Sequence, residues 1–244
     1  MATFRRHLVL CVLALAASAT YASEPLAVRI GYLAYLPATG PLLSNVIPEP
    51  ADAGLRGAEL AIIDSNSTGR FLQHSYSLEA ASGDDPASLL AAAKVLHAQG
   101  VRLFVLNAPA ASVRQLSQAL PDSLLFNAGS SDDPLRQSAC LANVLHTLPS
   151  RAMLTDALAQ FLTVRRWQRW LLISGPTEDD QAYAAALKRA AKRFGHTIVA
   201  EKSWSFDNDQ RRSAQAEMPL FTQTAEYDVV LVADERGDFG EYLP

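Results

Sequence analysis

The fold is decided by AVRIGYLAYLPATG at residues 27–40 and, after an irregular loop, by GLRGAELAIIDS at residues 54–65. The first segment is a short apolar run with β-branched residues that ends at a proline and a glycine, which predicts a buried strand. In the second segment Leu55, Ala58 and Ile62 recur at helical spacing and form one apolar stripe. A strand, a loop and a helix in this order predict the first half of a βαβ unit, in which helices cover parallel strands.

The same alternation of strand and helix continues to residue 147. The pattern predicts further strands at 75–79, 103–106 and 124–126, with helices at 86–97 and around 113–120. Asp85 before Pro86 signals a helix start, because a carboxylate caps the first turn and proline fits within it. The order predicts an α/β fold with a mostly parallel sheet flanked by helices, and we expect residues 23–147 to form this N-terminal lobe.

A second α/β lobe is predicted for residues 148–244. Strands are expected at 170–173, 197–202 and 228–233, and helices at 151–162, 180–194 and 212–222. In the first of these helices Leu154, Leu158 and Phe161 align on one face. Three strands are fewer than the roughly five of a usual open sheet, so we expect this lobe to be partial and the chain to be shortened at its C-terminal end.

Composition limits the function classes. The 244 residues are 49% hydrophobic and 19% charged, with a formal net charge of −4. This composition is that of a globular protein with a core, not of a disordered chain. A nucleic-acid partner is not expected, because binding a phosphate backbone needs a basic face and the sequence shows none.

The N-terminus has the pattern of a secretory signal peptide. A basic segment, Arg5 to His7, precedes the apolar run Leu8–Ala17, and small residues follow. We expect cleavage after Ala22, so that residues 1–22 are removed and the mature protein is secreted across the membrane. The apolar run is shorter than the roughly 20 residues that span a bilayer, so stable membrane insertion is not expected. Cleavage leaves Cys140 as the single cysteine, which we expect to be buried.

Catalytic and metal motifs are absent from the sequence. There is no G-x-S-x-G, H-E-x-x-H or glycine-rich phosphate loop, so neither an enzyme nor a cofactor is expected. The acidic pairs at 84–85, 132–133 and 179–180 and the near-pair Asp207 and Asp209 could bind a hard cation. We favour helix capping instead, because three of these four stand at expected helix starts. The four histidines of the mature chain are isolated, and we interpret them as surface or hinge residues.

Several short motifs together resemble one family. They are Ile30-Gly31, the segment 37–41, the first helix at 57–63, Asp84-Asp85-Pro86, the segment 126–135 and Trp170–Ser174. The pattern resembles the type I periplasmic substrate-binding proteins of ABC transporters, of the leucine/isoleucine/valine-binding kind. Within that family it looks most like the branch found beside quinoprotein (PQQ-dependent) alcohol dehydrogenase systems. The resemblance implies a solute-binding protein that closes two lobes over a small molecule and delivers it to a membrane permease.

The resemblance also implies where the solute binds. The expected ligand-binding residues follow the ends of strands or enter the second lobe: Tyr35, Ala108, Pro109, Ala110, Ser130, Ser131 and Asp179. In amino-acid-binding relatives a serine occupies the position that matches Pro109, and a tyrosine occupies the position that roughly matches Asp179. The resemblance therefore does not favour an ordinary branched-chain amino acid as the ligand. The acidic residue that binds the ammonium group of the ligand in those relatives would match a position near Asn208 or Asp209. Tyr35 and Trp204 could form aromatic walls of the cleft, although for Trp204 we favour packing in the core.

The solute class stays open between an alcohol-oxidation metabolite, a short carboxylate and the quinone cofactor itself. A tricarboxylate such as PQQ would need arginines, and Arg136 and Arg151 are placed near the expected crossover between lobes. We expect the hinge to include Leu148–Ser150. The alternative function is a non-catalytic sensor or scaffold module that binds a protein partner.

Overall fold

The computed structural model describes residues 26–37, 50, 52–204, 210–235, 237 and 240. The expected signal peptide and the positions near Asn208 and Asp209 lie outside these residues. The described elements are β1 (Leu26–Tyr35), α2 (Ala53–Leu72), β2 (His74–Gly83), α3 (Pro86–Ala98), β3 (Leu103–Asn107), α4 (Ala110–Ala119), β4 (Leu124–Asn127), the 3-10 helix η2 (Asp133–Arg136), β5 (Val144–His146), α5 (Arg151–Arg165), β6 (Arg169–Ser174), α6 (Glu178–Phe194), β7 (Thr197–Ser203), α7 (Gln210–Phe221) and β8 (Val229–Ala233).

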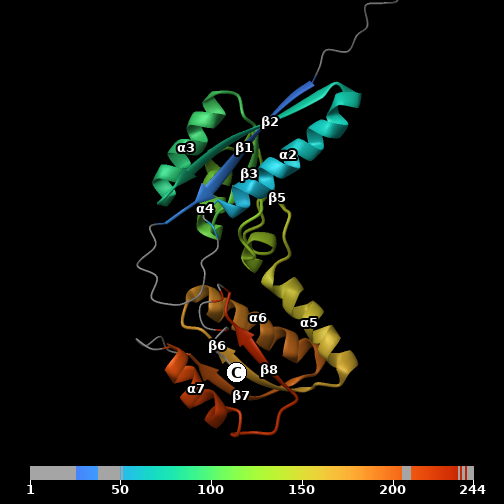
Figure 1. Ribbon diagram of the computed structural model, residues 1–244, viewed down its shortest axis with the longest axis vertical. Helices are drawn as coiled ribbons and strands as arrows, with labels where there is room; N and C mark the ends of the chain where they lie inside the picture. The colour runs from blue at the N-terminus through green and yellow to red at the C-terminus, as the bar shows by residue number, and fades with distance from the viewer. Residues whose placement is uncertain are drawn as a thin grey trace, which may run out of the picture.

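The strands form two separate sheets. The first has the order β2-β1-β3-β4-β5 and the second the order β7-β6-β8, and every neighbouring pair is parallel. Figure 1 shows the first sheet with α2, α3 and α4 above the second sheet with α5, α6 and α7. The predicted fold class, parallel sheets flanked by helices, is therefore confirmed.

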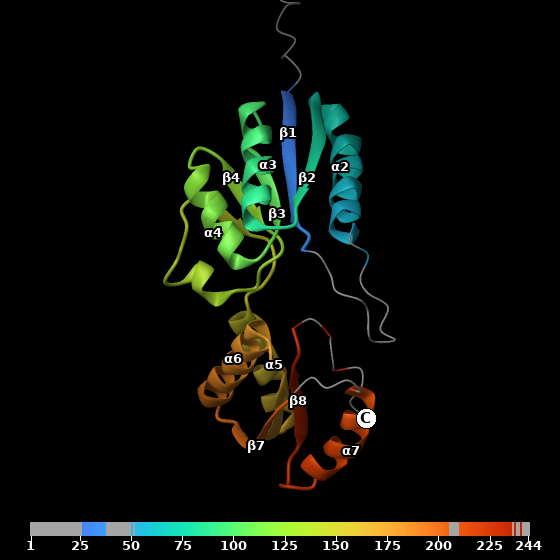
Figure 2. The ribbon, with the colours of Figure 1, turned by 90° about the vertical axis from the view of Figure 1, so that its left-hand side faces the viewer.

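The first sheet is covered well on one face only. Helices α3 and α4 lie on one side of the sheet and α2 lies on the other (Figure 2). The core under α3 and α4 includes Leu33, Leu89, Phe104 and Leu125, all fully buried. The stripe predicted for the first helix, Leu55, Ala58 and Ile62, is only partly buried, and Gly69 is the fully buried residue of α2. The reason is that α2 lies over the edge strand β2 and leaves part of the sheet beside it open.

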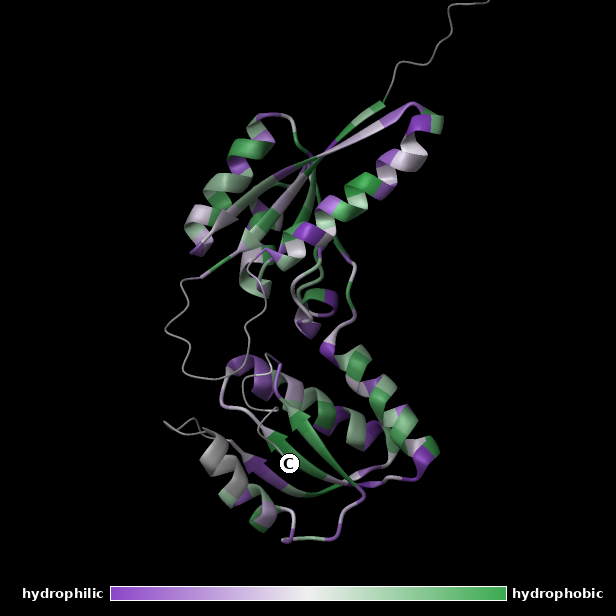
Figure 3. Ribbon diagram, viewed as in Figure 1, coloured by the Kyte–Doolittle hydropathy of each residue, from purple (hydrophilic) through white to green (hydrophobic). Residues whose placement is uncertain are grey.

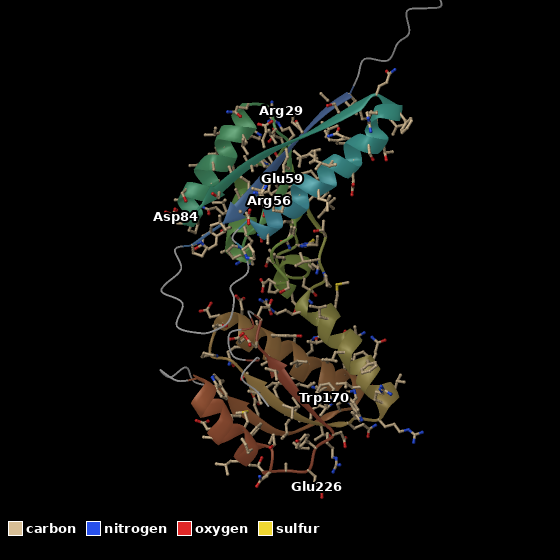
Figure 4. All side chains as sticks on the ribbon, viewed as in Figure 1. Arg29, Arg56, Glu59, Asp84, Trp170 and Glu226 are labelled. Carbon is tan, nitrogen blue, oxygen red and sulfur yellow. The ribbon has the colours of Figure 1, made fainter. Side chains whose placement is uncertain are left out.

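The second sheet has its core around Trp170 of β6, which packs with Leu172, Leu187 and Leu162. Figure 4 shows Trp170 inside the lower group of elements. The ring of His196 stacks on Trp170 with centroids 4.4 Å apart and is itself buried. The surface or hinge position expected for this histidine is therefore wrong. Trp204 packs against Ile173 and Met218, which confirms its core position.

The predicted core stripe of α5 is also wrong. Leu154 and Phe161 are 45% and 52% exposed, whereas Ala159 and Leu162 are buried. Figure 3 shows hydrophobic residues along much of α5, so periodicity alone did not separate its two faces. Thr155, Ala159 and Leu162 are buried, each one position after a residue of the predicted stripe. The small side chain of Ala159 allows α5 to approach its neighbours closely on this face.

All three acidic pairs contribute a carboxylate to a helix start, two of them at the start of their own helix. The Asp85 carboxylate accepts hydrogen bonds from the backbone N–H groups of Ala87 and Ser88, which cap α3. Asp180 forms a capping box with Thr177 at the start of α6. The third pair does not cap its own helix; Asp133 accepts a 2.9 Å hydrogen bond from the N–H of Ala152 in α5. Cys140, expected to be buried, is exposed because it lies in the irregular segment between η2 and β5.

Candidate functional site

The expected site residues of the first lobe lie along one edge of its sheet. Tyr35 ends β1, Ala108–Ala110 follow β3, and Ser130 and Ser131 follow β4. Since the strands are parallel, their carboxyl ends share this edge. Ligands of open α/β sheets bind at such edges, next to the point where the strand order reverses, which here lies between β1 and β3.

Asn127 fixes the loop that carries Ser130 and Ser131. Its side chain is fully buried, and its Oδ1 accepts a 2.9 Å hydrogen bond from the N–H of Ser130. Its Nδ2 donates to the carbonyl oxygen of Ser130 at 2.7 Å and lies 2.9 Å from Nδ1 of His146. These contacts hold the loop to both β4 and β5, so Ser131 has a fixed position. The sequence reasoning did not select Asn127, although an asparagine directly after a buried strand was a visible signal.

Gly129 brings the loops after β3 and β4 together. A Cβ at this position would lie 2.5 Å from the backbone nitrogen of Ala108, so only glycine permits the contact. Pro109 is the N-cap residue of α4 and forms no side-chain cap, which leaves the first N–H groups of α4 without a side-chain acceptor. The expected residues Ala108–Ala110 therefore adjoin the serine loop. Pro109 itself has no N–H, so the donors there are the first N–H groups of α4, beginning at Ala110.

Arg151 lies at the centre of the junction between the two lobes. Its side chain is 6% exposed, and each of its three nitrogens donates to a different carboxylate. Nε contacts Glu235 at 2.9 Å, Nη1 contacts Asp132 at 3.2 Å and Nη2 contacts Asp179 at 2.6 Å. We call these four residues with Ser131 the junction network, because Ser131 Oγ donates to Glu235 Oε1 at 2.6 Å. The network joins loops that follow β4 and β8 to the starts of α5 and α6.

The charges in the junction network shift the pKa values of two groups. Burial lowers the pKa of Arg151, but the hydrogen bond to Glu235 and the charges of Glu235, Asp179 and Asp132 together raise it above its usual value. Arg151 therefore stays charged. Burial raises the pKa of the Tyr183 hydroxyl, and the charge of Glu235 raises it further. Tyr183, one turn after Asp179 in α6, thus stays a neutral phenol beside the network.

Glu235 is held in place by a buried acid. Asp180 is 2% exposed, and its Oδ1 accepts a 2.8 Å hydrogen bond from the backbone N–H of Glu235. Since Asp180 also caps α6, one side chain fixes both the helix start and the turn after β8. The structure thus brings together Ser131 and Asp179 through Glu235 and Arg151. Glu235 was not predicted, because its partner Ser131 is 104 residues away.

Arg136 and Arg151, the two arginines expected near the crossover between the lobes, make different contacts. Arg136 donates to the carbonyl oxygen of Leu148 and contacts Met153 Sδ, so it braces the segment between the lobes. Arg151 has its nitrogens engaged by three carboxylates of the chain. The charge of Arg151 is therefore balanced within the protein, whereas the contacts of Arg136 are with uncharged groups.

A groove lies beside this edge, between α2 and the first sheet. Its volume is about 500 Å³, and its lining includes Ile30, Tyr32, Gly54, Ala61, Val105 and Asn107. We call it the α2 groove. Tyr32 and Asn107 stand at its polar end, where Asn107 Nδ2 lies 3.3 Å from the Tyr32 hydroxyl. Sequence reasoning selected their neighbours Tyr35 and Ala108 and missed both.

The described residues contain neither a group of metal-ligating side chains nor a membrane-spanning helix. Within the described ranges, no three His, Cys, Asp or Glu side chains gather as a metal-binding group. No helix in that part of the chain combines the length and the hydrophobicity that crossing a bilayer requires.

Comparisons with known proteins agree with this architecture. No family model matches the chain, and no curated protein sequence matches it. An ABC transporter substrate-binding protein from Desulfitobacterium hafniense, also solved in complex with Leu, matches with a TM-score of 0.61 and 16% identity over 86% of this chain and 59% of that chain. A leucine-, isoleucine-, valine-, threonine- and alanine-binding protein from Brucella ovis matches with a TM-score of 0.61 and 19% identity over 86% and 54% of the two chains.

A third match, an amino acid ABC transporter substrate-binding protein from Pseudomonas fluorescens, has a TM-score of 0.65 and 10% identity over 86% of this chain and 54% of that chain. At these identities the matches show the fold, which is the two-lobe α/β arrangement of periplasmic substrate-binding proteins. The matched region spans 54–59% of the length of these solved chains.

Proposed function

We propose that this chain is the solute-binding component of an ABC-type uptake system. In this proposal residues 1–22 are a cleaved signal peptide, and the lobes 23–147 and 148–244 bind a small polar solute between them in the periplasm. A membrane permease is the proposed partner, and no chemical step is assigned to the chain. The solved proteins of the same fold support the proposal, because their names describe substrate binding for ABC transporters.

The observation that carries the proposal is the junction network. Hydrogen-bonding groups from both lobes converge there, where the carboxyl edge of the first sheet meets the starts of α5 and α6. The side chains are fixed by backbone contacts and burial, so they are pre-organised to exchange hydrogen bonds with a solute. We propose Ser131, Asp179 and the N–H groups near Ala108–Ala110 as the solute contacts, with Tyr35 at the rim and Ser130 supporting the loop.

The geometry also supports a hinge at Leu148–Ser150. Arg136 holds the carbonyl of Leu148, and Ser150 caps α5 by accepting from the N–H of Met153. A short segment with fixed ends can concentrate a change in backbone angles, as hinges of two-lobe proteins do. A link to quinoprotein alcohol oxidation stays a prediction of the resemblance, and the three carboxylates around Arg151 weigh against this arginine as a ligand for PQQ.

Thermal melting with a panel of amino acids, short carboxylates, alcohols and PQQ tests the proposal. A solute that binds only the folded state stabilises it by about 2.7 kcal/mol at a hundredfold excess over Kd. We expect at least one compound to raise the Tm of the wild type, and we expect Ser131→Ala to reduce that rise. If no compound shifts the Tm, the proposal fails and a protein-binding module becomes the better explanation.

A further inference from the structure

The α2 groove has the size and lining of a small-molecule site. Its volume of about 500 Å³ falls within the usual range of ligand pockets. On the helix side it is lined by Gly54, Ala58, Ala61, Ile62 and Ser65, and on the sheet side by residues such as Ile30 and Val105. Among the described residues that line it, none is charged. The groove therefore favours an apolar, uncharged occupant.

The groove is open because of how α2 is attached. Asn66 binds the backbone of Tyr76 in β2 through two hydrogen bonds of 2.8 Å, one donated and one accepted. Gly69, the buried residue of the helix, has no side chain and lies against the backbone of His74. The second half of α2 is thus fixed to the edge strand. At Gly54, Ala58 and Ala61 the small side chains of its first half leave a space above β1 and β3, with Ile62 at the side of that space.

One end of the groove is polar and adjoins the proposed solute site. Tyr32 is 5% exposed, and its hydroxyl lies 3.3 Å from Asn107 Nδ2 at the carboxyl end of β3. Gly54 lets α2 begin close to this pair, since a Cβ there would lie 2.4 Å from the Tyr32 oxygen. Asn107 in turn lies against Gly129, two residues before Ser131. The groove thus continues from the serine loop into the apolar space under α2.

We infer that the α2 groove binds the apolar body of the solute, and that this solute is a small amphiphile with an uncharged hydrogen-bonding group. The hydroxyl of Tyr32 and the amide of Asn107 suit a hydroxyl or carbonyl group, because both can donate and accept without a charge. The apolar remainder of the molecule would lie along Ala58, Ala61 and Val105. This inference rests on the proposed function and specifies the class of its solute.

A series of linear alcohols tests the inference. Dissociation constants of 1-butanol, 1-hexanol and 1-octanol are measured by calorimetry on the wild type, and alanine-methyl NMR signals of Ala58 and Ala61 are followed in parallel. Each added methylene that enters the groove should tighten binding about fourfold. Ala61→Phe, which fills the groove, should weaken 1-octanol binding at least tenfold. Tyr32→Phe, which removes only the hydroxyl, should weaken all three alcohols by about the same factor.

Ile63→Phe is the matched control. It places the same ring on the same helix, at a residue that is 65% exposed and does not line the groove. Ile63→Phe should therefore bind the alcohols as the wild type does. Equal effects of the two phenylalanine variants, or affinities that do not depend on chain length, would overturn the inference. If Ala61→Phe does not fold, unshifted Ala58 and Ala61 methyl signals in the wild type overturn it instead.

The outcomes separate this inference from the proposed function. Polar solutes of the melting panel that bind through Ser131 but ignore chain length and Ala61→Phe would refute the groove and retain the solute-binding role. The opposite result is alcohol binding that requires an open groove but is unaffected by Ser131→Ala, while no solute of the panel binds at the junction network. That result would retain the groove as a binding site and refute the proposed solute-binding role of the junction.

Discussion

The hydroxyl of Ser131 donates a 2.6 Å hydrogen bond to the carboxylate of Glu235, although the two residues are 104 positions apart in the chain. Ser131 follows the first sheet and Glu235 follows the last strand of the second. The other oxygen of Glu235 accepts from Arg151, which also binds Asp132 and Asp179. One carboxylate therefore links the serine loop to the ion pairs that join the two lobes.

Replacing Glu235 tests the contribution of this link to stability. Glu235→Ala removes an acceptor from Arg151 and from Ser131, and we expect the free energy of unfolding to fall by about 1–3 kcal/mol, because hydrogen bonds to charged groups are worth that much. Urea unfolding measures the change. Glu226→Ala is the matched control, since Glu226 also pairs with an arginine but is 91% exposed at the far end of the second lobe (Figure 4). We expect no measurable loss there, and equal losses in both variants would contradict the argument.

Two glycines provide a test of the loop contact. Gly129→Ala places a methyl group 2.5 Å from the backbone nitrogen of Ala108, so the two loops must separate, and we expect a loss of about 1–3 kcal/mol. Gly57→Ala in α2 meets nothing within 4 Å and should stabilise the protein by about 0.5–1 kcal/mol, because alanine loses less backbone entropy in a helix. Chemical denaturation of both variants measures this. A Gly129→Ala variant as stable as the wild type would refute the tight contact.

His146 makes stability depend on pH. Burial lowers the pKa of its imidazole, and the charge of Arg136 lowers it further, against a smaller opposing effect of the Leu135 carbonyl. Above about pH 6.5 the ring is neutral in both the folded and unfolded states, so its contribution is complete. As the pH falls below 6.5 and through the lower folded pKa, the unfolded state binds the proton first, and stability decreases.

The measurement for His146 is the urea midpoint at several values between pH 7.5 and pH 5. We expect a smaller decrease for His146→Gln, which cannot take up a proton and can still accept from Asn127 Nδ2. An identical decrease in the variant and the wild type would show that other groups cause the effect.

The buried face of α5 can be tested with adjacent residues. Leu162 is 2% exposed, and Leu162→Ala should cost about 2–5 kcal/mol, as large-to-small changes in cores do. Phe161 is 52% exposed, with the Arg165 guanidinium 5.4 Å from its ring centre, so Phe161→Ala should cost less than about 1 kcal/mol. Thermal or urea unfolding compares the two variants. A larger cost for Phe161→Ala would mean that the stripe predicted from the sequence is the buried one.

Most secondary structure was predictable because its signals are local. The capped start at Asp85 and Pro86, the apolar strand at Leu103 and the glycine after Phe194 each determine a boundary through their own backbone chemistry. Which face of a helix is buried is not a local property. The predicted stripe of α2 is only partly buried, with Ala58 and Ile62 facing the sheet. In α5 Leu154 and Phe161 of the predicted stripe are exposed, whereas Leu158 packs against the core.

The candidate site was predictable only in part for the same reason. The positions Ala108, Ser130 and Ser131 follow from the rule that parallel strands place their carboxyl ends at one edge, and the structure puts them there. Asn127, Glu235 and Tyr32 were missed because their roles come from partners in distant segments.

The sequence by itself determined the order of strands and helices and hence the parallel α/β class, because hydrophobic period and capping residues act within a few positions of each other. Only the tertiary structure decided that Arg151 gathers carboxylates from three segments and that α2 leaves a groove above β1 and β3. Those features depend on contacts between side chains that are far apart in the sequence. Such contacts form only when the sheets pack together, so local sequence patterns do not predict them.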